Sequence, residues 1–183
     1  MANRKVQILM GSDSDASVMQ RSVDVLTELG VTSHMTVASA HRSPDRVSRI
    51  IDESAGNGVR VFIVGAGAAA HLAGVVAAHS KLPVIGVPID SSPLQGWDAL
   101  LATVQMPPGV PVATVSVGKA GAANAAVLAV QILALADEKL ASQLVKYRKE
   151  QAKAVEQKSQ KLKTPLMGKL SKRVVHQMTK VKL

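Results

Sequence analysis

Along the chain, short apolar runs alternate with longer segments in which apolar and polar residues follow a helical period. Most of the short runs are continuously apolar and rich in β-branched residues, and they predict five strands, at Val6–Met10, Val31–Val37, Val61–Val64, Pro83–Val87 and Val112–Val117. The longer segments predict helices at Ala16–Leu29, Pro44–Ala55, His71–Ser80, Trp97–Val104 and, rich in alanine, at about Ala122–Ala136.

This alternation predicts a single doubly wound, flavodoxin-like α/β fold, with five parallel strands and helices on both faces of the sheet. Such a sheet often has the spatial order 2-1-3-4-5, and it binds ligands beyond the carboxyl ends of its strands, where the winding changes direction. We therefore expect the chemistry of this protein in the loops that follow the first three strands.

The composition changes after residue 136, so we divide the chain into an α/β domain (1–136), a C-terminal helical extension (137–164) and a basic tail (165–183). The formal net charge is +9, yet residues 1–136 are neutral overall and the whole excess lies in residues 137–183. A basic extension is typical of a solvated face or an interaction arm. We do not expect nucleic-acid binding to be the main function.

Composition narrows the class of protein further. Hydrophobic residues make up 47% of the 183 residues, as expected for one globular domain. Cysteine is absent, which excludes disulfides, thiolate nucleophiles and cysteine-based metal sites. No apolar stretch is long enough to span a membrane and the first residues lack a signal-peptide pattern, so we expect a cytoplasmic protein without a membrane partner.

The loop after the first predicted strand is Gly11-Ser12-Asp13-Ser14-Asp15. A glycine turn with hydroxyls beside a helix N-terminus suits a phosphate group. The two aspartates do not, because carboxylates repel phosphate. We expect one of them to cap the helix and the other to accept hydrogen bonds from ribose hydroxyls. Plain helix capping by serine and aspartate remains the alternative for this loop.

Two further loops carry candidate chemistry at the same edge of the sheet. His41 and Arg42 follow the second strand, where an imidazole can transfer protons and a guanidinium can hold phosphate. After the third strand, Gly65–Gly74 offers a floor almost without side chains, on which a flat ring can lie. His71 in this stretch is either a second ligand contact or an ordinary helix-start histidine. The stretch formally matches a dinucleotide-binding pattern, but that pattern belongs after the first strand.

Together these loops resemble those of a known family. G-S-D-S-D from Gly11, S-A-H-R-S-P-D from Ser39 and G-A-G-A-A-A-H-L-A-G from Gly65 are similar to motifs of the N5-carboxyaminoimidazole ribonucleotide mutases, the mutase branch of the PurE family of purine biosynthesis. Further similarities are G-V-P-I, Q-M-P-P-G-V-P-V from Gln105 and G-K-A-G-A-A-N-A-A from Gly118. The resemblance spans roughly residues 5–150, in order and at the family's spacing.

The resemblance implies a small ribonucleotide substrate whose carboxylate moves from an exocyclic nitrogen to ring carbon C4, without a metal or other cofactor. It implies that His41 is the catalytic proton carrier, that Ser12, Ser39 and Arg42 hold the phosphate, and that Asp15 holds the ribose hydroxyls. A third set of residues would line the part of the pocket that holds the ring and the carbon dioxide: Gly67, Ala68, Ala69, His71 and Leu72. The family also implies a homo-octamer.

Ala68 and Ala73 depart from the family pattern, which usually has glycine and proline at these positions. An alanine at position 68 would be unfavourable if the backbone there has a positive φ. The related branch that carboxylates aminoimidazole ribonucleotide directly with carbon dioxide has His-Lys in place of His41-Arg42. That carboxylase, and a nucleotide-binding module without catalysis, remain the alternatives.

Overall fold

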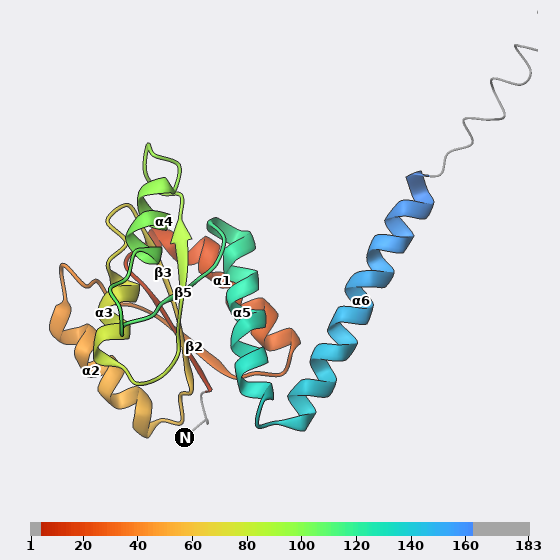
Figure 1. Cartoon of the computed structure of the whole chain (residues 1–183), viewed down its shortest axis with the longest axis horizontal. Coiled ribbons are helices and arrows are strands. Elements are labelled where there is room, and N and C mark those ends of the chain that lie inside the picture. Colours follow the sequence, from red (N-terminus) through yellow and green to blue (C-terminus); the bar gives the residue numbers. More distant parts are fainter. Residues whose placement is uncertain (1–4, 163–183) are drawn as a thin grey trace, which may run out of the picture. The chain divides into compact units, whose positions relative to one another are not determined.

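The computed structural model of the protein describes residues 5–162 (Figure 1). Its strands are β1 (Val6–Met10), β2 (Ser33–Val37), β3 (Val61–Gly67), β4 (Val84–Ile89) and β5 (Ala113–Thr114). A short 3-10 helix, η1 (Asp13–Asp15), precedes the helices α1 (Ala16–Glu28), α2 (Pro44–Gly56), α3 (Leu72–His79), α4 (Trp97–Val104), α5 (Gly118–Ala134) and α6 (Glu138–Leu162). The strands pair in parallel in the order β2-β1-β3-β4-β5, which confirms the predicted fold class and strand order.

Helices cover both faces of the sheet, as the continuously apolar strands require. Helices α2, α3 and α4 lie on one face, and α1 and α5 lie on the other (Figure 1). On the first face, Val47 of α2 and Val76 of α3 share a buried cluster with Phe62, the only phenylalanine of the chain. On the second face, small alanines let α5 approach α1 closely, and the Ser22 hydroxyl donates a hydrogen bond of 2.7 Å to the carbonyl of Ala122.

The register of the strands brings their carboxyl ends to one edge of the sheet. Met10 at the end of β1 lies level with Val37 of β2 and with Gly65 of β3. Gly67, the last residue of β3, is in turn level with Ile89 at the end of β4. The loops after these four strands therefore start side by side.

Several element boundaries differ from the predicted ones. The last strand contains only Ala113 and Thr114 and not Val112–Val117, because it pairs with β4 alone at the edge of the sheet. The fourth strand continues through Pro88 to Ile89, since Pro88 lies opposite Ala66 in a β3 that is itself longer than predicted. The Ala-rich helix begins at Gly118, four residues before the predicted start at Ala122.

The chain forms two compact units, Met1–Leu144 and Val145–Leu183. In the first unit, Lys5 forms an ion pair of 3.0 Å with Asp137, whose carboxylate also accepts a hydrogen bond from the backbone of Leu140 near the start of α6. In the second, residues 145–162 continue α6 as a polar, mostly exposed helix. The boundaries at 136 and 164 stay predictions, and the basic tail (165–183) lies outside the described residues. No described helix is long and apolar enough to cross a membrane.

Candidate active site

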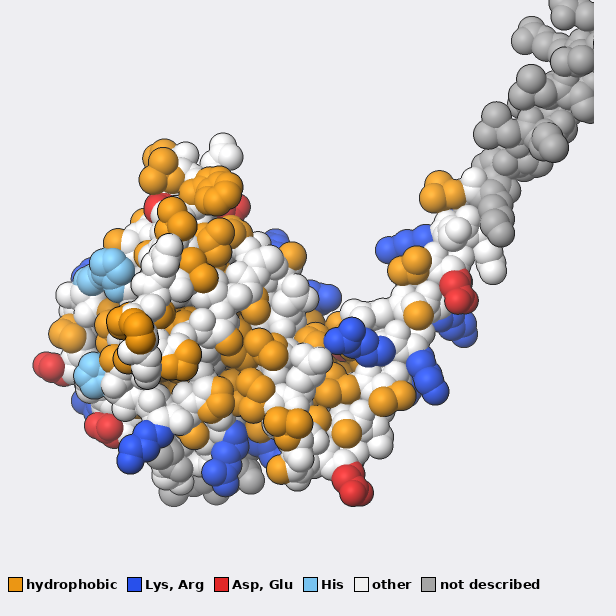
Figure 2. All heavy atoms as spheres, in the orientation of Figure 1, with side chains coloured by type: hydrophobic (Ala, Val, Ile, Leu, Met, Phe, Trp, Pro, Cys, Tyr) orange, Lys and Arg blue, Asp and Glu red, His pale blue; other side chains and the backbone are white. Residues whose placement is uncertain are grey.

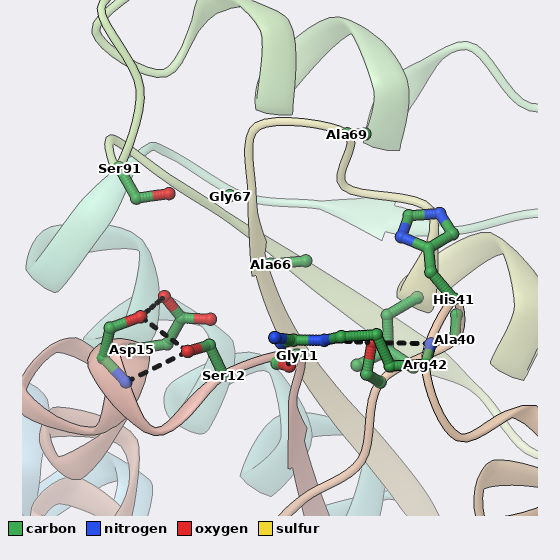
Figure 3. A pocket seen from close by; sticks show the side chains of 13 residues that line it. Gly11, Ser12, Asp15, Ala40, His41, Arg42, Ala66, Gly67, Ala69 and Ser91 are labelled. Carbon is green, nitrogen blue, oxygen red and sulfur yellow. Dashed lines mark hydrogen bonds between the residues drawn. The ribbon is translucent and has the colours of Figure 1, made fainter.

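A polar pocket of about 260 Å³ opens at the carboxyl edge of the sheet (Figure 3). The loops after β1, β2, β3 and β4 all contribute to it, as the register of the strands predicts. The residues that line it are Gly11, Ser12, Ser14, Asp15, Ser39, Ala40, His41, Arg42, Ala66, Gly67, Ala69, Leu72 and Ser91. Of the ten residues expected from the sequence, all but Ala68 and His71 lie in this lining.

The loop after β1 is organised by hydroxyl groups. Ser12 caps η1, because its backbone is extended and its side chain accepts a hydrogen bond of 3.3 Å from the Ser14 amide. The Ser14 hydroxyl donates to that of Ser12 at 2.8 Å. Asp15 occupies the N-cap position of α1 but makes no capping hydrogen bond with its side chain. Asp15 is therefore not a capping aspartate, and Ser12 serves as the cap one turn earlier.

Asp15 is the buried acid of the pocket, with only 4% of its surface exposed. Burial raises the pKa of its carboxyl group above the ordinary value, and the negative charge of Asp13 adds to the rise. Hydrogen bonds from the Ser12 backbone and the Ser14 hydroxyl act in the opposite direction. A buried carboxylate with so few donors gains stability from a ligand that brings hydroxyl groups to it.

Arg42 crosses from the second loop to the first. Its Nη2 donates to the carbonyl of Gly11 at 3.2 Å, and its backbone amide and Nε donate to the Ser39 hydroxyl at 3.2 and 3.5 Å. Among residues 5–162, no carboxylate forms an ion pair with this guanidinium. Arg42 thus supplies the pocket with a positioned positive charge that suits a phosphate group.

His41 and His71 face each other across the second and third loops. The Nε2 atom of His41 lies 2.9 Å from the Nδ1 atom of His71, and the two rings meet edge to face with their centroids 5.0 Å apart. One of the two facing nitrogens must donate and the other accept, so the tautomers of the two neutral rings are linked. His71 reaches the pocket through His41 and does not line it directly.

The third loop begins with a residue in an unfavourable conformation. Ala68 has a φ of +49°, in the left-handed region that favours glycine. The amide of Ala70 then donates to the carbonyl of Ala68, and the amide of His71 to that of Ala69, both at 2.8 Å. These tight turns carry the chain from β3 into α3, with Ala69 and Leu72 left on the pocket wall.

The candidate set taken from the sequence does not include Ser91, nor Gly11, Ser14, Ala40 and Ala66. The predicted fourth strand ends at Val87, which leaves Ser91 four residues beyond the expected edge of the sheet. Ser91 enters the pocket because β4 ends at Ile89, two residues before it. A longer fourth strand in the prediction would have brought this serine to the carboxyl edge. Within residues 5–162, acidic and histidine side chains do not gather in any group of three that could hold a metal ion.

The fold and pocket define a class of α/β protein. At the carboxyl edge of its parallel sheet it presents a basic group suited to a phosphate, a buried acid and a histidine pair. Residues 5–154 match the family model described as AIR carboxylase, and the chain belongs to this family.

Curated relatives agree with this assignment. An N5-carboxyaminoimidazole ribonucleotide mutase of Brucella melitensis is 49% identical over 150 residues, which cover 82% of this chain and 93% of the relative. The enzyme of the same name from Bacillus subtilis is 50% identical over 157 residues, covering 86% and 97%. The crystal structure of Treponema denticola PurE superposes with a TM-score of 0.79 at 29% identity, covering 87% of this chain and 98% of that one.

We predict that Ala68→Gly stabilises the protein. The left-handed conformation costs an alanine about 1–2 kcal/mol, and the extra freedom of glycine in the unfolded chain offsets about 0.5–1 kcal/mol of that relief. The free energy of unfolding, measured by urea denaturation, should therefore rise by about 0.5–1 kcal/mol. Ala70→Gly is the matched control: Ala70 is buried without a positive φ, so this variant should lose stability. A less stable Ala68→Gly variant would contradict the strain.

We also predict that Asp15→Asn is more stable than the parent protein at neutral pH, because it removes a buried charge. The raised pKa means that the folded state holds the Asp15 proton more tightly than the unfolded state. The stability cost of ionisation is thus full above the folded pKa and vanishes below the ordinary value of 3.8. The advantage of the variant should shrink over that range in urea denaturation. Asp13→Asn, at an exposed site, removes only the smallest contribution to the raised pKa of Asp15 and should therefore give a smaller gain at neutral pH.

Proposed function

We propose that the protein is an N5-carboxyaminoimidazole ribonucleotide mutase, which forms 4-carboxy-5-aminoimidazole ribonucleotide. The observation that carries the proposal is one pocket in which His41, Arg42 and Asp15 meet, in a chain about half identical to relatives of that name. Each of the three groups has a counterpart in such a substrate: a proton acceptor site, a phosphate and a ribose.

The proposed binding mode uses the first two loops. Arg42, with Ser12 and Ser39, holds the phosphate, supported by the fixed orientation of its guanidinium and by the absence of a competing carboxylate among the described ion pairs. Asp15 accepts hydrogen bonds from the ribose hydroxyls, which would compensate its burial. The base then lies over Gly67 and Ala69, with Leu72 beside it, where few side chains intervene.

The proposed reaction needs one proton carrier. Protonated His41 gives its proton to the exocyclic nitrogen as the bond from that nitrogen to the carboxylate carbon breaks and carbon dioxide is released. The C4 carbon of the ring attacks the trapped carbon dioxide, and neutral His41 removes the C4 proton. Protons and charge balance over the cycle, so His41 returns to its starting state. A small pocket closed over the bound substrate would favour recapture of the gas over its escape.

His71 acts in this proposal as a positioning residue for His41. Their 2.9 Å contact fixes which nitrogen of His41 is turned to its partner and which is left for the substrate. His71 stands at the N-cap position of α3, so its place is set by the helix and by the turns at Ala68 and Ala69.

The proposal is tested by following product absorbance from freshly prepared N5-carboxyaminoimidazole ribonucleotide, without ATP, metal or bicarbonate. We expect rapid conversion by the parent protein, and a loss of about a hundredfold or more in kcat for His41→Asn, because general acid and base catalysis is worth about 10²–10⁴-fold. Binding of aminoimidazole ribonucleotide, measured by calorimetry, should persist in that variant. His79→Asn is the matched control, since His79 lies outside the pocket and bonds the carbonyl of Val75.

Other outcomes of this assay would favour a different function or a different proton carrier. Turnover only with aminoimidazole ribonucleotide and high bicarbonate would mean the direct carboxylase, and saturable binding without turnover would mean a nucleotide-binding module. An active His41→Asn variant would overturn the assigned proton carrier.

We further propose that the protein works as a homo-oligomer, an octamer, in the cytoplasm. The number eight is what the family resemblance implies. Association itself is supported by an apolar stripe on α4 and the loop before it: Leu94, Trp97, Leu101 and Val104 are all exposed, with Trp97 at 67%. Figure 2 shows hydrophobic side chains gathered over this end of the first unit. Residues spaced three or four apart share one helix face, so the stripe can be covered as a whole.

Light scattering should give a mass of eight chains of 19.1 kDa each, at both low and high salt, because apolar burial is not screened. Trp97→Lys together with Leu101→Lys should reduce that mass. A monomer at both salt concentrations would contradict the octamer, and dissociation only at high salt would assign assembly to charged groups.

A further inference from the structure

Ser91 differs from the other serines of the pocket in its hydrogen bonding. Ser12 and Ser14 bond each other at 2.8 Å, and the Ser39 hydroxyl accepts hydrogen bonds from Arg42. The Ser91 hydroxyl has no hydrogen bond to any residue in the described part of the chain. It is thus the one serine hydroxyl of the described pocket lining that the protein does not use for its own structure.

The position of this hydroxyl depends on a glycine. Gly67 ends β3 next to the end of β4, and a Cβ atom built on Gly67 would lie 1.8 Å from the Ser91 Oγ. The hydroxyl therefore occupies the space that any larger residue at position 67 would fill. In Figure 3 the Ser91 side chain points toward Gly67, over the floor on which the base is proposed to lie.

Ser91 is also placed away from the proposed proton carrier. Figure 3 shows Ser91 and His41 on opposite sides of the pocket, with Gly67 and Ala66 between them. A ligand that fills the pocket from one side to the other displaces water from the Ser91 hydroxyl, which costs free energy unless the ligand replaces the lost hydrogen bond.

We infer that Ser91 is a substrate-positioning residue whose hydroxyl makes a hydrogen bond to the bound imidazole ribonucleotide. This inference rests on the proposed function and adds the fourth loop to its binding site. Because Ser91 is on the side opposite His41, its loss should weaken binding while the proton transfer keeps its pH dependence. The role also gives a reason for glycine at position 67, since a side chain there would push the hydroxyl aside.

The test compares the full-length parent protein with Ser91→Ala, Ser91→Thr and a control, Ser17→Ala. Ser17 is an exposed serine on α1 that does not line the pocket. Calorimetry with 5-aminoimidazole ribonucleotide, without bicarbonate, gives Kd without turnover, and the mutase assay gives kcat, KM and their pH profiles. Thermal melting shows whether each variant is folded.

For Ser91→Ala we expect Kd and KM to rise about tenfold, the loss of one hydrogen bond, with kcat changed less than about twofold and an unaltered pH profile. Ser91→Thr keeps the hydroxyl and should restore most of the affinity, and Ser17→Ala should behave as the parent.

Parent affinity in Ser91→Ala would overturn the inference, as would a Ser91→Thr variant that binds as weakly as Ser91→Ala. If the parent protein binds the ribonucleotide but does not turn it over, the proposed mutase function fails while the affinity comparison still decides the role of Ser91. If the parent protein neither binds nor reacts, both are wrong.

Discussion

The pocket depends on the parallel register of the four strands β1 to β4. Because Met10, Val37 and Gly65 lie level, and Gly67 lies level with Ile89, four loops leave the sheet at one edge. A slip of one residue in any strand would exchange the side chains that face the two helical layers, so the close packing on both faces of the sheet opposes such a slip. The strands that bury Phe62 and Val64 thereby also fix where His41, Arg42 and Asp15 meet.

A second constraint is the absence of side chains where β3 ends. A Cβ atom on Gly65 would lie 2.4 Å from the Met19 Sδ of α1, and one on Gly67 would meet Ser91. Residues two apart in a strand point to the same face, so both glycines open the side of the sheet that α1 covers. Gly65 lets the helix pack, and Gly67 lets the fourth loop reach the pocket. Of the two glycines at the end of β3, Gly65 thus contributes to the packing of the fold and Gly67 to the shape of the pocket.

The sequence was sufficient to predict the sheet, its strand order and the first three loops, because apolar runs and the topology of doubly wound folds determine them together. The sequence was not sufficient where contacts between residues far apart in the chain determine the end of a strand or the neighbour of a side chain. Proline usually ends a strand, yet Pro88 lies opposite Ala66 within β4. Because β4 therefore extends to Ile89, Ser91 lies at the edge of the pocket. The contact between His41 and His71 joins residues 30 positions apart, so no local pattern could reveal its 2.9 Å distance.

The strained alanine, Ala68, and the pair of His41 and His71 are structurally connected through the loop after β3. The turn from β3 to α3 requires a left-handed residue at position 68, and the two successive turns that follow deliver His71 to His41. Strain of this kind persists only where the surroundings hold it, and here the buried Ala70 and Leu72 anchor the loop on the α3 side while β3 anchors it on the other. Alanine narrows the conformations open to the loop compared with glycine. The methyl group of Ala68 therefore costs stability but restricts the backbone that positions His71 against His41, the proposed proton carrier.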